Sequence, residues 1–104
     1  MIKTRGFRVS PYEIERVIQD NLPMITASAV FSVPNEEIEE EIVLIYTAKE
    51  ELAKNEILFE MKKHLPNYML PEQVLYKHIM PLKSLHEKEV DKEVLKREFL
   101  GGLR

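Results

Sequence analysis

One short run in this 104-residue sequence is almost entirely apolar, namely residues 42–47 (IVLIYT). A strand with one face in water alternates apolar and polar residues, whereas a strand covered on both faces reads as a continuous apolar run. The run therefore predicts a central strand with other elements packed on both of its sides. This requirement favours a layered fold in which helices cover a small sheet.

The segments around this strand complete an α+β fold. Residues 1–10 predict a β-hairpin that turns at Arg5 and Gly6, because glycine reaches positive φ without steric cost. Residues 25–33 alternate as a second strand, and residues 74–77 form a short third one. Helical spacing of apolar residues predicts helices over residues 11–22, 55–64 and 92–100. We therefore expect a sheet of about three strands plus an N-terminal hairpin, flanked by three helices.

The first and last helices carry recognisable start and stop signals. Ser10 is placed at an N-cap, Pro11 at the first helical position, and Glu13 completes an S-x-x-E capping box. Asp91 is the predicted N-cap of the last helix, and the glycine pair that begins at Gly101 is its predicted end.

Composition excludes several classes of function. The net charge is −3, with 15 basic and 18 acidic side chains intermixed, so the basic excess of a nucleic-acid binder is absent. No apolar run reaches about 18 residues, so no membrane span is expected. The lack of cysteine excludes disulfides and thiolate metal sites and fits the reducing cytoplasm, where we expect this chain.

Other polar and apolar clusters have ordinary explanations. The three histidines are far apart in the sequence, so no metal site is expected. Five glutamates within residues 36–41 are interpreted as a solvated loop in preference to a cation site. The methionines at positions 24, 61, 69 and 80 are expected to fill the core.

Two segments are harder to explain by folding alone. Residues 3–9 (KTRGFRV) place three cations before the positive N-terminus of a helix, which is unfavourable unless an anion such as a phosphate joins them. Simple solvation of these cations is the alternative. Residues 65–71 (LPNYMLP) form a stiff loop in which two prolines bracket a tyrosine. Packing of this loop back on the core is an equal alternative.

Three motifs in register resemble the adenylate-forming superfamily, which comprises acyl-CoA synthetases, luciferases and peptide-synthetase adenylation domains. IKTRGFRVSPYEIE (residues 2–15) resembles K-x-x-G-x-R-V-x-P-x-E-I-E. AVFSVPNEEIEEEIVLIYT (residues 29–47) resembles A-V-x-G-V-P-D-x-x-x-G-E and the strand that follows it. LPNYMLPEQV (residues 65–74) resembles L-P-x-Y-M-x-P. The first motif looks most like that of the acyl-CoA synthetases.

The resemblance implies that residues 1–104 are a single C-terminal subdomain, a fragment whose large N-terminal adenylation domain lies outside this chain. The implied reaction joins an acid to CoA, with ATP converted to AMP and pyrophosphate. ATP, Mg²⁺ and CoA are implied for the whole enzyme, whereas the isolated chain is expected to hold no cofactor and to be inactive. The implied partners are its own N-terminal domain and CoA, or the pantetheine of an acyl carrier.

The resemblance also assigns site residues. In the thioester-forming pose the hairpin residues Lys3, Arg5, Gly6, Phe7 and Arg8 are implied to lie beside CoA, pantetheine or phosphate. Gly6 would let the pantetheine arm pass close to the backbone, where a Cβ would intrude. Arg8 would lie near a phosphate. This interpretation requires residues 3–9 and 65–71 to share one surface.

The adenylation lysine is the uncertain part of the resemblance. The family places it in P-x-x-x-x-G-K-[IV]-x-R, and the matching stretch here is PLKSLHEKEVDK (residues 81–92). By count, Glu89 occupies the lysine position and Lys88 the glycine position. We interpret Lys88 as the functional lysine, and true loss of the lysine is the alternative.

Three other functions stay open at this point. The chain can be a non-catalytic docking or regulatory module of the same fold that has lost the adenylation lysine. It can be a peptide-synthetase-type subdomain that acts on a carrier protein, or an unrelated small α+β binding domain.

Overall fold

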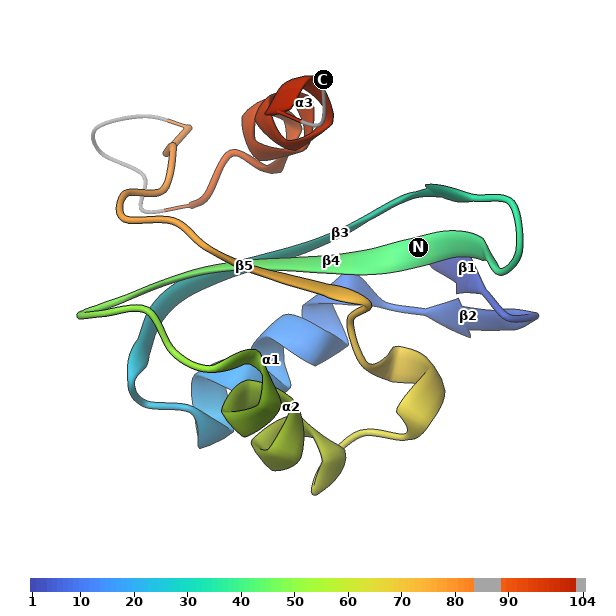
Figure 1. Ribbon diagram of the computed structural model, residues 1–104, viewed down its shortest axis with the longest axis horizontal. Coiled ribbons are helices and arrows are strands. Elements are labelled where there is room, and N and C mark those ends of the chain that lie inside the picture. Colours follow the sequence, from blue (N-terminus) through green and yellow to red (C-terminus); the bar gives the residue numbers. More distant parts are fainter. Residues whose placement is uncertain (84–88, 103–104) are drawn as a thin grey trace.

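The computed structural model of the protein describes residues 1–83 and 89–102, and it has the α+β architecture expected from the sequence (Figure 1). Two short strands and a helix precede two long strands, and a helix, a 3-10 turn, a short strand and a last helix follow. In chain order the elements are β1 (Ile2–Thr4), β2 (Phe7–Val9), α1 (Pro11–Asn21), β3 (Ile25–Asn35), β4 (Glu39–Ala48), α2 (Lys54–Lys62), η1 (Asn67–Met69), β5 (Gln73–Tyr76) and α3 (Lys92–Gly102).

The apolar run lies in the middle of the sheet, as predicted. The three-stranded sheet has the order β3-β4-β5, with β3 antiparallel and β5 parallel to β4. The register pairs Val30 with Leu44 on one side and Leu44 with Val74 on the other. β1 and β2 form a separate antiparallel hairpin in which Lys3 lies opposite Arg8.

Helices cover both faces of this sheet (Figure 1). Helices α1 and α2 lie on one face with the β1–β2 hairpin, and α3 lies on the other. The alternation of side chains along β4 divides the apolar run between two cores. The first core receives Ile42, Leu44 and Tyr46, whereas the second receives Val43 and Ile45. A run without alternation is therefore required here.

The two predicted helix caps have different outcomes. The Oδ1 of Asp91 accepts the N–H of Val94 at 3.2 Å, so this N-cap is confirmed. The Ser10 side chain makes no capping hydrogen bond, and the predicted capping box is wrong. The N–H of Glu13 instead donates to the Ser10 carbonyl at 3.2 Å in a tight first turn, although Ser10 does occupy the N-cap position.

Helix α3 ends at Gly102, within the glycine pair predicted to end it. Two further expectations are corrected. Met24 is exposed, whereas the other three methionines expected in the core are buried there. Residues 39–41 belong to β4 and are not a solvated loop, since only residues 36–38 form the turn.

No helix within the described ranges combines the length and the apolar character needed to cross a bilayer. Among the same residues, no group of three or more histidine, aspartate or glutamate side chains is arranged to hold a metal ion.

Candidate functional site

The hairpin and the proline-bracketed loop meet on one surface, as the sequence interpretation requires. The rings of Phe7 and Tyr68 stack with their centroids 4.0 Å apart and their planes 10° from parallel. The segments lie far apart in the sequence, and this aromatic pair joins the hairpin to η1.

The hairpin tip projects its backbone into open space. Arg5 and Gly6 both adopt left-handed conformations, with φ of 52° and 83°. Two such residues in succession form the tight turn whose twist matches a β-hairpin. A Cβ built on Gly6 meets no atom within 4 Å, so within this chain the backbone conformation, not crowding, calls for glycine. Among the described residues, none occupies the position that a side chain at Gly6 would take.

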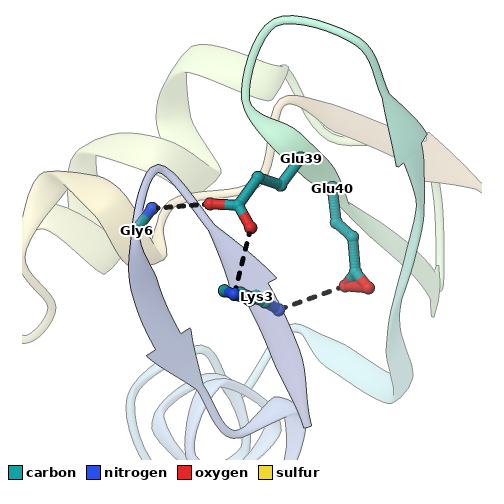
Figure 2. A network of polar contacts seen from close by, with 4 residues as sticks. All are labelled: Lys3, Gly6, Glu39 and Glu40. Atoms are coloured by element: carbon teal, nitrogen blue, oxygen red, sulfur yellow. Dashed lines mark hydrogen bonds and ion pairs between the residues drawn. The ribbon is translucent and has the colours of Figure 1, made fainter.

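The chain itself supplies an anion for one of the hairpin cations. The Nζ of Lys3 lies 3.6 Å from a carboxylate oxygen of Glu39, and the Lys3 N–H donates to Glu40 at 3.1 Å (Figure 2). For Lys3, the anion that the sequence analysis required is a carboxylate of this chain. The side chains of Arg5 and Arg8 are exposed and form no ion pair with the described residues.

Glu72 joins the end of the proline-bracketed loop to the central strand β4 through hydrogen bonds, and nothing in the sequence indicated this role. Its N–H donates to the Ile42 carbonyl at 3.0 Å, and its carboxylate accepts the Ile42 N–H at 3.3 Å. Burial raises the pKa of the Glu72 carboxyl, while the bond from Ile42 and the charge of Arg5 oppose the increase. Glu72 follows the second proline of the loop, so it fixes the segment that carries Tyr68.

Thr4, the last residue of β1, is buried, and its hydroxyl oxygen Oγ1 has no hydrogen-bond partner among the described residues. A buried polar group without a partner lowers stability by about 1–3 kcal/mol. We expect the isosteric Thr4→Val change to raise the free energy of unfolding by about 1 kcal/mol, measured by urea denaturation. Thr4→Ser is the control, because it keeps the hydroxyl and loses the methyl group. A loss of stability in Thr4→Val would show that the hydroxyl is satisfied.

The segment proposed to carry the adenylation lysine is described only at its base. Lys88 itself lies outside the described residues. Leu82 and Val90 form an antiparallel bridge, and the Lys83 N–H donates to the Glu89 carbonyl at 3.1 Å. The carboxylate of Glu89 is exposed and lies 3.4 Å from the Lys83 Nζ. Glu89, which occupies the lysine position by count, is thus paired with Lys83 of the same segment.

An ion pair that the sequence analysis also missed holds the start of α3. The Lys92 Nζ lies 2.8 Å from a carboxylate oxygen of Glu15, and it lies over the Tyr12 ring, 4.6 Å from its centroid. The same oxygen of Glu15 accepts the Val30 N–H at 2.8 Å, on the edge of β3 that pairs with no other strand. A cavity of about 690 Å³ opens beside these groups. The contacts tie α3 to α1 and β3 just after the segment that contains Lys88.

Known proteins share this fold and up to about a third of the aligned residues, although no protein-family model matches the chain. A mycosubtilin synthase polypeptide of Bacillus subtilis is 35% identical over 106 residues, which cover 98% of the chain and 4% of that protein. A long-chain-fatty-acid–CoA ligase of Yersinia pestis is 31% identical over 101 residues, 95% of the chain and 16% of the ligase.

A solved structure of a Mycobacterium tuberculosis fatty acyl CoA synthetase matches with a TM-score of 0.84 and 29% identity, over 95% of this chain and 19% of that one. The chain therefore spans less than a fifth of each of these three proteins. Its sequence relatives and its structural neighbour are members of the same enzyme superfamily. The chain belongs to the adenylate-forming, AMP-binding enzyme superfamily and corresponds to the C-terminal subdomain of its members.

Proposed function

We propose that this chain is the mobile C-terminal subdomain of an AMP-forming acyl-CoA synthetase in the cytoplasm. The subdomain closes over its N-terminal domain twice, first for adenylation of the acid and then for thioester formation. The observation that supports this proposal is the stack of Phe7 on Tyr68, which joins two motif segments into one face beside the open Gly6 backbone. ATP, Mg²⁺ and CoA serve the whole enzyme.

The hairpin residues have distinct roles in the thioester-forming pose. Gly6 presents backbone without a side chain, so the pantetheine arm passes against the tip. Arg5 and Arg8 offer exposed guanidinium groups, which bind phosphate oxygens through paired N–H donors. Lys3 is paired with Glu39 and also helps to hold the hairpin.

Lys88 acts in the adenylating pose. Its ammonium group bridges the substrate carboxylate and the α-phosphate of ATP, and it stabilises the negative charge that shifts between them during attack. The ion pair of Glu89 with Lys83 supports this choice, because it partly neutralises the carboxylate beside the lysine.

A peptide-synthetase-type subdomain is the second candidate function. The 35% identity to the mycosubtilin synthase polypeptide favours it, since this identity exceeds the 31% found with the fatty-acid ligase. The acceptor would then be the pantetheine of a carrier protein in place of CoA. Comparing free CoA with a carrier-bound thiol as acceptor distinguishes the two candidates.

Arg8→Ala tests the hairpin assignment in the enzyme that contains this chain. Loss of a charge-assisted contact to phosphate is expected to raise the KM for CoA about tenfold or more. Pyrophosphate exchange, which reports adenylation, is expected to stay unchanged. The matched control is Arg16→Ala, which removes an exposed arginine of α1 that pairs only with Asp20 among the described residues. An unchanged KM for CoA, or an equal effect of Arg16→Ala, would contradict the assignment.

A further inference from the structure

Glu39 holds a backbone conformation that residues with a Cβ rarely adopt. It begins β4 opposite Asn35, and its φ is 76°. The pattern A-V-x-G-V-P-D-x-x-x-G-E, aligned on residues 29–40, has glycine at this position. Glycine reaches positive φ without strain, whereas a glutamate there is strained. Such strain persists only where the surrounding contacts compensate for it.

The Glu39 carboxylate reaches two places on the hairpin at once (Figure 2). One oxygen accepts the N–H of Gly6 at 3.1 Å, and the other lies 3.6 Å from the Lys3 Nζ. Glu37 shows that the charge of this turn alone does not create such contacts. Its side chain is exposed and forms no hydrogen bond or ion pair with the described residues.

The hairpin needs support of this kind, because its strands have only three residues each. An isolated two-stranded ribbon is marginal in water. Three of its peptide N–H groups are bonded to residues 38–40. The Lys3 N–H donates to the Glu40 carboxylate, the Arg5 N–H to the Ile38 carbonyl at 2.9 Å, and the Gly6 N–H to Glu39. Among the contacts of the described residues with the hairpin, only the bond that Gly6 donates to Glu39 holds the outermost peptide of the tip.

We propose that Glu39 is a positioning residue that fixes the hairpin tip for the thioester-forming step. This inference rests on the function proposed above, in which the pantetheine arm passes the Gly6 backbone. A tip held in one orientation before the arm arrives needs no further ordering during the reaction. The strained backbone of Glu39 directs its carboxylate at the tip, and the two contacts on the hairpin stabilise that strained backbone.

The structural part of the proposal is tested on this chain by hydrogen exchange of the Gly6 amide. Glu39→Ala is expected to lower the protection of this amide about tenfold, the usual loss for a hydrogen bond to a charged acceptor. Glu39→Gln keeps an acceptor oxygen and is expected to retain most of the protection. Glu37→Gln removes the same charge from the turn and is expected to change nothing.

Glu39→Gly separates tip positioning from overall stability. It relieves the strained φ, so the midpoint of thermal unfolding is expected to stay or rise, yet Gly6 protection is expected to fall as in Glu39→Ala. Retained protection in both Glu39→Ala and Glu39→Gly would overturn the proposal, as would an equal loss in Glu37→Gln.

The functional part is tested in the enzyme that contains this chain. Glu39→Ala is expected to slow acyl transfer at saturating CoA about tenfold, while the KM for CoA and pyrophosphate exchange stay unchanged, and Glu39→Gln restores most of the rate. A normal transfer rate in Glu39→Ala, despite lost Gly6 protection, would overturn the positioning role. Failure of the unmodified enzyme to form any thioester would refute the proposed function instead, while the Gly6 exchange data would still decide whether Glu39 holds the tip.

Discussion

Replacing Lys88 with alanine, in the enzyme that contains this chain, is expected to slow acyl-adenylate formation about 100- to 1000-fold. This is the usual effect of removing one group that stabilises developing charge in a transition state. Lys88 is expected to act only while the acid attacks ATP, so transfer of a preformed acyl-adenylate to CoA should continue at its normal rate. ATP–pyrophosphate exchange measures the first step, and single-turnover transfer measures the second.

Glu89→Gln is the control for Lys88→Ala, because it changes the charge of the neighbouring residue that occupies the lysine position by count. It is expected to have little effect on adenylation, since the Glu89 carboxylate is exposed and paired with Lys83. Unchanged pyrophosphate exchange in Lys88→Ala would remove this lysine from the mechanism. Absent exchange in the unmodified enzyme would favour the non-catalytic module.

Leu44→Ala is expected to lower the free energy of unfolding by about 2–5 kcal/mol, because Leu44 is 0% exposed at the centre of β4. The change removes apolar contacts from the core that includes residues of α1 and α2, and it leaves a cavity that the covered sheet has little room to close. Domains of this size are stable by only about 5–15 kcal/mol, so this loss is a large fraction of the total. Urea denaturation of the purified chain measures it.

Ile79→Ala is the matched control for Leu44→Ala, because Ile79 is an aliphatic residue that is 72% exposed. Its replacement is expected to change stability by less than about 0.5 kcal/mol. If Leu44→Ala does not fold, the smaller change Leu44→Val is expected to cost about 1 kcal/mol and gives the same information. Equal effects at positions 44 and 79 would mean that β4 is not the covered central strand.

The fold was largely predictable, because its strongest signals are local. The run of residues 42–47 has no alternation, and that pattern alone required a strand covered on both faces. Gly6 marked the hairpin turn, and Asp91 marked the start of α3. Each of these signals depends on a residue and its near neighbours, so no knowledge of distant partners was needed.

The contacts that build the site depend on distant residues, and these escaped prediction. A run of glutamates is typical of a solvated surface, and nothing local indicates that Glu39 and Glu40 bond to the N-terminal hairpin. The interpretation from the family resemblance required the hairpin and the loop to meet, but it did not indicate that Phe7 and Tyr68 form the contact. The Ser10 hydroxyl fits the capping pattern, but the Glu13 N–H donates to the Ser10 backbone carbonyl instead.

In the proposed function, one small domain serves two half-reactions through two different segments. The decisive measurement follows both half-reactions side by side in the Lys88→Ala and Arg8→Ala enzymes. We expect Lys88→Ala to slow only adenylation, and Arg8→Ala to impair only the transfer to CoA. If both changes impair the same half-reaction, or if neither impairs any, the division of work between the two segments is refuted.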